Sequence, residues 1–212
     1  MRLPTKILHT IVLFPVLALA GCHAEPASAG EVDRIAEVLP IRTGMKVADV
    51  GAGDGEWSLA IAERVGDDGH VFATEVDESE LQKIEREVQR SGLTNITMVF
   101  GTQEESGLPD GCCDAILLRL VFHHFIDPSA MLGSLQRALL PGGHMAVIDI
   151  TPQGHWRKLD GVPERGGHGI PPDDLIREIS DQGFELVARY DDWNGDPDRF
   201  CVVFRSKSLQ DP

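Results

Sequence analysis

The residues best suited to bind a ligand form a glycine-rich turn directly after a short apolar strand. Residues 47–55 read Val-Ala-Asp-Val-Gly-Ala-Gly-Asp-Gly. Glycine tolerates a positive φ and leaves no side chain between a ligand and the backbone N–H groups. The helix expected at residues 56–65 points its N-terminus at this turn, and open α/β sheets bind ligands at such a place. Because Asp49 and Asp54 make the turn acidic, we expect a ligand with a cationic or neutral polar end.

A second chemical signal ends the next apolar segment. Residues 71–77 read Val-Phe-Ala-Thr-Glu-Val-Asp, which places Glu75 20 positions after Gly55. A carboxylate at this spacing can accept both hydroxyl hydrogens of a ribose. Strand alternation favours Glu75 over Asp77 as the residue at the strand tip. The alternatives without a ligand are a purely structural glycine turn and a solvated charge at the strand end.

Four motifs, in this order along the chain, resemble the class I S-adenosylmethionine-dependent methyltransferases. Residues 49–55 are similar to that family's first motif, and Glu75 to its ribose-binding acid. Residues 108–118, Leu-Pro-Asp-Gly-Cys-Cys-Asp-Ala-Ile-Leu-Leu, resemble its loop and fourth strand. Residues 140–148, Leu-Pro-Gly-Gly-His-Met-Ala-Val-Ile, resemble its turn and fifth strand. A nicotinamide-binding domain fits less well, because the glycine spacing is G-x-G-x-G and not G-x-G-x-x-G.

The resemblance implies S-adenosyl-L-methionine as the cofactor and a set of residues that bind it. Arg119, at the end of the fourth strand, is a further candidate, which would hydrogen-bond the cofactor or close the pocket. The set itself combines the glycine turn, the ribose acid and the loop after the third strand: Asp49, Gly51, Ala52, Gly53, Asp54, Gly55, Glu75, Thr102, Gln103 and Glu104. In the resembled family that loop borders the adenine ring, often with an acid where Thr102 or Gln103 stands here. A threonine or glutamine can still hydrogen-bond the adenine amine. Ordinary loop polarity is the alternative for these loop residues.

The acceptor side of the site is expected at His123, His124 and the segment after the fifth strand. Methyl transfer is an in-line displacement that needs the acceptor held close and aligned, and a histidine can take a proton from a hydroxyl or ammonium acceptor. The glycine-rich segment 151–170 adds three candidate acceptor-binding residues, Trp156, Arg165 and His168. Scaffold histidines and a solvated lid are the alternatives.

The N-terminus resembles a bacterial lipoprotein signal peptide. Arg2 and Lys6 flank the start of an apolar run over residues 7–20, and residues 19–22 read Leu-Ala-Gly-Cys, similar to a lipobox. In that class of proteins the cysteine, here Cys22, is acylated and becomes the first mature residue. We expect a signal peptide over 1–21, a tether over 22–29, a methyltransferase domain over 30–206 and a tail over 207–212. The expected location is the extracytoplasmic side of a bacterial cell envelope, with an uncleaved anchor as the alternative.

Charge and cysteine content narrow the partners. The formal net charge is −15, which disfavours attraction to nucleic acid or to bulk anionic lipid. The expected acceptor is therefore a small molecule or a lipid-like compound. Cys112, Cys113 and Cys201 do not have the spacing of a zinc site, and no metal site is expected.

The alternation of apolar strands with amphipathic helices predicts an α/β fold with helices on both faces of one sheet. We expect strands at residues 45–51, 70–76, 96–100, 115–120, 145–150, 184–190 and 200–204. Helices are expected at residues 31–39, 56–65, 78–91, 128–140 and 173–182. The resemblance implies a seven-stranded Rossmann-like sheet of order 3-2-1-4-5-7-6 with strand 7 antiparallel.

Two functional classes fit these features. The first is a membrane-anchored methyltransferase, which is favoured because Asp49, the three glycines and Glu75 are all present. The second is a non-catalytic lipoprotein that binds a nucleoside or an S-adenosyl ligand. The second arises because the cofactor is made in the cytoplasm, whereas a lipoprotein faces outward. The sequence does not identify the acceptor or the oligomeric state.

Overall fold

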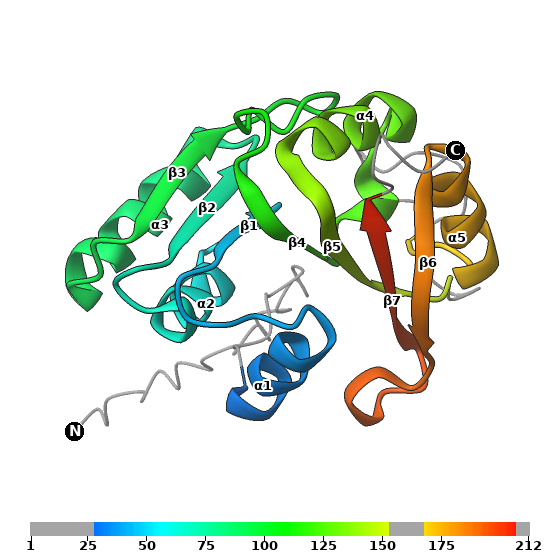
Figure 1. The fold of residues 1–212 in the computed structure, drawn as a ribbon, viewed down its shortest axis with the longest axis horizontal. Helices are drawn as coiled ribbons and strands as arrows, with labels where there is room; N and C mark the ends of the chain where they lie inside the picture. The colour runs from blue at the N-terminus through cyan, green and yellow to red at the C-terminus, as the bar shows by residue number, and fades with distance from the viewer. Residues whose placement is uncertain (1–27, 153–167, 207–212) are drawn as a thin grey trace, which may run out of the picture.

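A single seven-stranded sheet organises the protein in a computed structural model that describes residues 28–152 and 168–206 (Figure 1). The strands are β1 (Lys46–Val50), β2 (His70–Glu75), β3 (Ile96–Phe100), β4 (Cys113–Arg119), β5 (Leu139–Ile150), β6 (Phe184–Tyr190) and β7 (Arg199–Ser206). Their order is β3-β2-β1-β4-β5-β7-β6. β1 to β5 pair in parallel, and β7 runs antiparallel to both β5 and β6. The predicted fold class and strand order are confirmed.

Five α-helices are described, and they cover both faces of the sheet. They are α1 (Ala29–Val38), α2 (Glu56–Val65), α3 (Glu78–Ser91), α4 (Pro128–Ala138) and α5 (Pro172–Asp181). Alternate residues of β1 face opposite layers, as expected for a strand buried on both sides. Val47 belongs to the apolar cluster that includes Ile61 of α2, and Ala48 to the cluster that includes Leu132 of α4. The first three helices thus cover one face, and α4 and α5 cover the other.

The helix ends follow local capping chemistry. The side chain of Asp127 accepts a hydrogen bond from the N–H of Ala130 (3.0 Å), with Pro128 in the first turn of α4. Gly92 ends α3 in the left-handed conformation, which glycine adopts without strain. α1 starts two residues before the predicted position, because the Ser28 side chain caps it by accepting from the N–H of Glu31 (3.2 Å).

The boundary between α4 and β5 differs from the prediction. The expected helix over 128–140 is too long, because α4 ends at Ala138 and β5 begins at Leu139. Leu139 is buried and pairs with Cys113, so burying this side chain against the sheet outweighs two more residues of helix. The pairing of β4 with β5 shifts register between Cys113 and Ala115. Gly142, with φ of +77°, therefore lies within an irregular part of β5 and not in a turn before it.

The parallel strands bring their carboxyl ends to one edge of the sheet, where open α/β folds place their sites. Across residues 28–152 and 168–206, none of the helices combines the length and apolarity that a bilayer span requires. The expected signal peptide, most of the tether and the tail fall outside this part of the chain, so those boundaries stay predictions.

Candidate functional site

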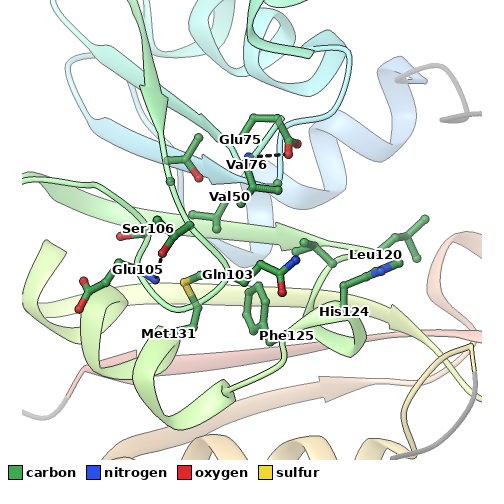
Figure 2. A pocket seen from close by; sticks show the side chains of 15 residues that line it. Val50, Glu75, Val76, Gln103, Glu105, Ser106, Leu120, His124, Phe125 and Met131 are labelled. Carbon is green, nitrogen blue, oxygen red and sulfur yellow. Dashed lines mark hydrogen bonds between the residues drawn. The ribbon is translucent and has the colours of Figure 1, made fainter. Parts of the chain in front are cut away.

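A cavity of about 320 Å³ opens at the carboxyl ends of β1, β2, β3 and β4 and beside the first turn of α4. Figure 2 shows Glu75 and Val76 on one side of it and Met131, Phe125 and His124 on the other. Of the predicted cofactor residues, four line this cavity: Gly51, Glu75, Thr102 and Gln103. The candidate His124 lines it as well, so the sequence-derived cofactor and acceptor candidates meet in one place.

Glu75 ends β2, as strand alternation predicted, and its carboxylate is fixed by two backbone donors. Oε2 accepts from the N–H of Gly53 (3.0 Å), and Oε1 accepts from the N–H of Val76 (2.7 Å). Each carboxylate oxygen has two acceptor sites, so capacity for two ribose hydroxyls remains. Asp77 instead caps α3 by accepting from the N–H of Ser79 (2.7 Å).

The glycine turn differs from the expectation of free backbone N–H groups, because it offers a ligand open space and its N–H groups are already bonded within the protein. The N–H groups of Gly51 and Ala52 both donate to the carbonyl oxygen of Thr74 (3.0 Å each), and that of Gly53 donates to Glu75. These donors are therefore engaged within the protein. At Gly53 an added Cβ would meet no atom within 4 Å, so a ligand could lie directly over the backbone there.

The two acids of the turn have different environments. Asp49 is buried behind the turn and accepts a hydrogen bond from the Ser58 hydroxyl (2.6 Å). Burial raises its pKa to about 6, although the Ser58 hydrogen bond and the Arg119 charge act in the opposite direction. Asp54 faces the start of α2 and accepts from the N–H of Glu56 (3.3 Å). Neither acid lines the cavity, nor do Ala52 and Gly55.

The loop after β3 is shaped by Thr102. Its hydroxyl accepts from the N–H groups of Glu104 (3.3 Å) and Glu105 (3.0 Å), and its own N–H donates to the carbonyl oxygen of Glu105 (2.7 Å). This turn brings Gln103 to the cavity and leaves Glu104 exposed and outside the cavity lining. Gln103 is therefore better placed than Glu104 for the predicted adenine contact.

Arg119 lies at the end of β4 but outside the cavity lining. Its guanidinium carbon stacks 4.5 Å from the ring centroid of Trp57, and its Nε lies 3.5 Å from Oε1 of Glu31. The same glutamate oxygen accepts from the indole N–H of Trp193 (3.0 Å). These buried groups tie α1 to β4, to α2 and to the turn before β7. The contact expected between Arg119 and the cofactor stays a prediction.

The histidine pair lies in a short 3-10 helix, Phe122–His124, that follows β4. His123 Nδ1 lies 2.6 Å from Oδ1 of Asp149, and Oδ2 of Asp149 accepts from the N–H of His123 (3.2 Å). Sequence reasoning missed Asp149. Its position one residue before the end of β5, beside the end of β4, is the signal that could have identified it.

His124 has an unusual environment for a proposed base. Burial, and after it the neighbouring His123, lower the pKa of His124 to about 4. The ring is neutral at neutral pH, with a lone pair available, but it is a weak base there. The structure therefore places His124 at the cavity, but its low pKa does not favour the predicted proton transfer.

His168 joins the same cluster. Its ring centroid lies 4.9 Å from that of His123 and 6.2 Å from that of His124. The other two predicted acceptor residues, Trp156 and Arg165, lie outside the described residues. Six apolar residues that line the cavity were not predicted as site residues: Val50, Val76, Leu120, Val121, Phe125 and Met131.

Residues 41–184 match the family described as a methyltransferase domain. The chain belongs to this family, which confirms the predicted class of S-adenosylmethionine-dependent methyltransferases and with it the expected cofactor. A demethylmenaquinone methyltransferase of Listeria welshimeri is 29% identical over 115 residues, which cover 54% of this chain and 49% of the relative. A ubiquinone/menaquinone biosynthesis C-methyltransferase of Shewanella frigidimarina is 31% identical over 120 residues, covering 56% and 48%. The chain thus spans about half the length of these curated relatives.

Solved structures share the fold over more of the chain. A S-adenosylmethionine-dependent methyltransferase from Aquifex aeolicus superposes with a TM-score of 0.69 at 22% identity, covering 82% of this chain and 88% of that one. The cyclase SpnF also gives a TM-score of 0.69, at 16% identity, covering 84% and 80%. At these identities the likeness shows the fold alone.

Proposed function

We propose that this protein transfers the methyl group of S-adenosylmethionine to a small-molecule or lipid-like acceptor bound at the His124 end of the cavity. One observation supports this most directly: a single cavity has a fixed carboxylate suited to a ribose, Glu75, and opposite it a wall formed by Phe125, Met131 and His124. A cofactor held at the first end would need its acceptor at the second, because the displacement requires close alignment.

The acceptor is proposed to be an apolar aromatic compound with a hydroxyl group, of the quinol type. The wall formed by Leu120, Val121, Phe125 and Met131 is apolar, which suits a ring, and the aligned relatives are described as quinone-pathway methyltransferases. The basic residues of segment 151–170, Arg165 among them, are compatible with an additional anionic group. The acidic net charge of −15 argues against a nucleic acid.

The test uses the full chain and methyl-labelled S-adenosylmethionine with a panel of quinols, phenols and fatty-acid derivatives. We expect label in a quinol-type product, and a lower kcat for the His124→Ala variant than for the His144→Ala control, which lies on β5 away from the cavity lining. Cofactor binding without product from any acceptor would favour the non-catalytic binding lipoprotein. Absence of cofactor binding would refute both.

We also propose that an acylated Cys22 holds the domain on the outer side of a bacterial membrane. The lipobox-like residues 19–22 support this, and a strongly acidic protein needs a covalent lipid because its charge does not favour anionic headgroups. Labelling of growing cells with a fatty-acid analogue should mark the wild type and not the Cys22→Ser variant. Equal labelling of the two proteins would refute the anchor.

A further inference from the structure

Three histidines from two separate segments meet beside the cavity. His123 and His124 follow β4, and His168 precedes α5. Each offers one ring nitrogen, and these three nitrogens lie within 4.8 Å of one another. His123 and His168 are buried, with 2% and 8% of their surface exposed. Three imidazoles this close, two of them buried and His124 partly buried, form a donor set of the kind that holds a transition metal ion.

The free nitrogen of His123 is fixed by its neighbour. Asp149 is completely buried, and its Oδ1 lies 2.6 Å from Nδ1 of His123. With the proton on Nδ1, the lone pair of the ring is on Nε2. Among the residues that the structure describes, this buried Nε2 has no hydrogen-bond partner. A carboxylate that orients a histidine in this way is the usual outer partner of a metal-binding histidine.

We propose that His123, His124 and His168 bind one divalent transition metal ion, Zn²⁺ in the first instance, with Asp149 as the positioning residue. In a tetrahedral zinc site with Zn–N distances near 2.05 Å, the ligand nitrogens lie about 3.3 Å apart. The spacing of up to 4.8 Å must therefore shorten by about 1.5 Å when an ion binds. Imidazole ligands suit Zn²⁺ and other late first-row metals better than Mg²⁺ or Ca²⁺, which prefer oxygen.

Three protein ligands leave one position of a tetrahedral ion open. His124 lines the cavity, so the ion would be reachable from the space assigned to the acceptor. If the proposed methyltransferase function is correct, the open position would take a hydroxyl oxygen of the acceptor and align it. This role rests on the proposed function, whereas metal binding itself does not.

The experiment measures metal content and metal binding of the full-length protein, without reference to activity. We expect one Zn²⁺ per chain by elemental analysis, and saturable binding of Zn²⁺ alone by calorimetry after chelator treatment. Co²⁺ added in its place should give the intense visible absorption of a tetrahedral site. His124→Gln and His168→Gln should each abolish stoichiometric binding, whereas His144→Gln, on β5 outside the cluster, should retain it. Asp149→Asn should weaken binding about 10- to 100-fold without abolishing it.

Three results would overturn the site: no binding of Zn²⁺ or Co²⁺ to the folded wild type, an octahedral Co²⁺ spectrum, or full binding in His168→Gln. Because the first two are measured on the wild type, a variant that fails to fold does not protect the proposal. Calorimetry with S-adenosylhomocysteine on the same sample separates the two hypotheses. Metal binding without cofactor binding would refute the proposed function alone, and the reverse would refute the metal site alone.

Discussion

Replacing Glu75 by alanine tests the cofactor site most directly. The variant removes the carboxylate expected to accept the ribose hydroxyls, and it also leaves the N–H groups of Gly53 and Val76 without their acceptor. Hydrogen bonds to a charged group contribute about 1.5–3 kcal/mol, which corresponds to roughly a 10- to 150-fold weaker Kd. Loosening of the glycine turn should place the loss toward the upper end. Glu75→Gln keeps one acceptor oxygen and should lose less.

The assay is calorimetric titration with S-adenosylhomocysteine, together with thermal unfolding of each variant. Asp77→Ala is the matched control, because it also removes an acid near the end of β2. Asp77 caps α3 and lies outside the cavity lining. Asp77→Ala should therefore lower the melting temperature and leave Kd unchanged.

Two outcomes would contradict this reasoning. An unchanged Kd in a folded Glu75→Ala protein would show that the carboxylate does not contact the cofactor. A larger loss of affinity from Asp77→Ala than from Glu75→Ala would show that the ribose contact is made by Asp77 and not by Glu75. If affinity falls only because the variant is partly unfolded, the thermal unfolding curves will show it.

Three further predictions concern the residues around the cavity. Burial raises the pKa of Asp49 from 3.8 to about 6, so the folded protein favours the protonated carboxyl. The stability that this protonation contributes is complete below about pH 4 and is lost as pH rises through 6. The wild type should therefore lose about 3 kcal/mol of stability relative to Asp49→Asn across that range. Urea unfolding of both proteins at several pH values checks this, and parallel pH profiles would contradict it. Gly51→Ala should destabilise more than Gly53→Ala, because its Cβ would lie 2.6 Å from Cγ2 of Val121 whereas that of Gly53 meets nothing within 4 Å. Gly53→Ala should therefore stay folded and weaken S-adenosylhomocysteine binding, and unchanged affinity in calorimetry would contradict a ligand over this glycine. Arg119→Met should cost about 3–5 kcal/mol in urea unfolding, because it leaves the buried Glu31 carboxylate without its cation; a cost near zero would mean that water reaches the pair.

The strand order was predictable because local pattern and family resemblance agree at each element. The predicted spans of α2, α3, β3 and β6 match the observed ones to the residue. The error at Leu139 has a physical source. A helical pattern and a buried strand residue are indistinguishable in an apolar run, and the deciding contact, the pairing with Cys113, is 26 positions away in the sequence.

The candidate site was predictable in its cofactor half and less so in its acceptor half. The position of Glu75 follows from its spacing after the glycine turn. The sequence placed His168 in the same polar insertion as Arg165, but it could not show where the chain comes back to the sheet after that insertion. The N–H of Ile170 donates to the carbonyl oxygen of Ile150 (2.9 Å), which brings His168 back to the end of β5. Asp149 was missed because an acid inside an apolar strand gives no periodic signal. Its role depends on contact with His123, which follows the neighbouring strand β4.

The two halves of the cavity therefore bear on different parts of the function, cofactor binding and the reaction. The glycine turn and Glu75 belong to the part that the family resemblance identifies, and they bear on whether a cofactor binds. The fold alone does not fix the reaction, since a cyclase and a methyltransferase superpose equally well on this chain. What is done with a bound cofactor depends on the groups that face it, here Phe125 and Met131 in the cavity wall and the cluster of His123, His124 and His168. Variants at Glu75 test for the cofactor, whereas variants at the histidine cluster test for the chemistry.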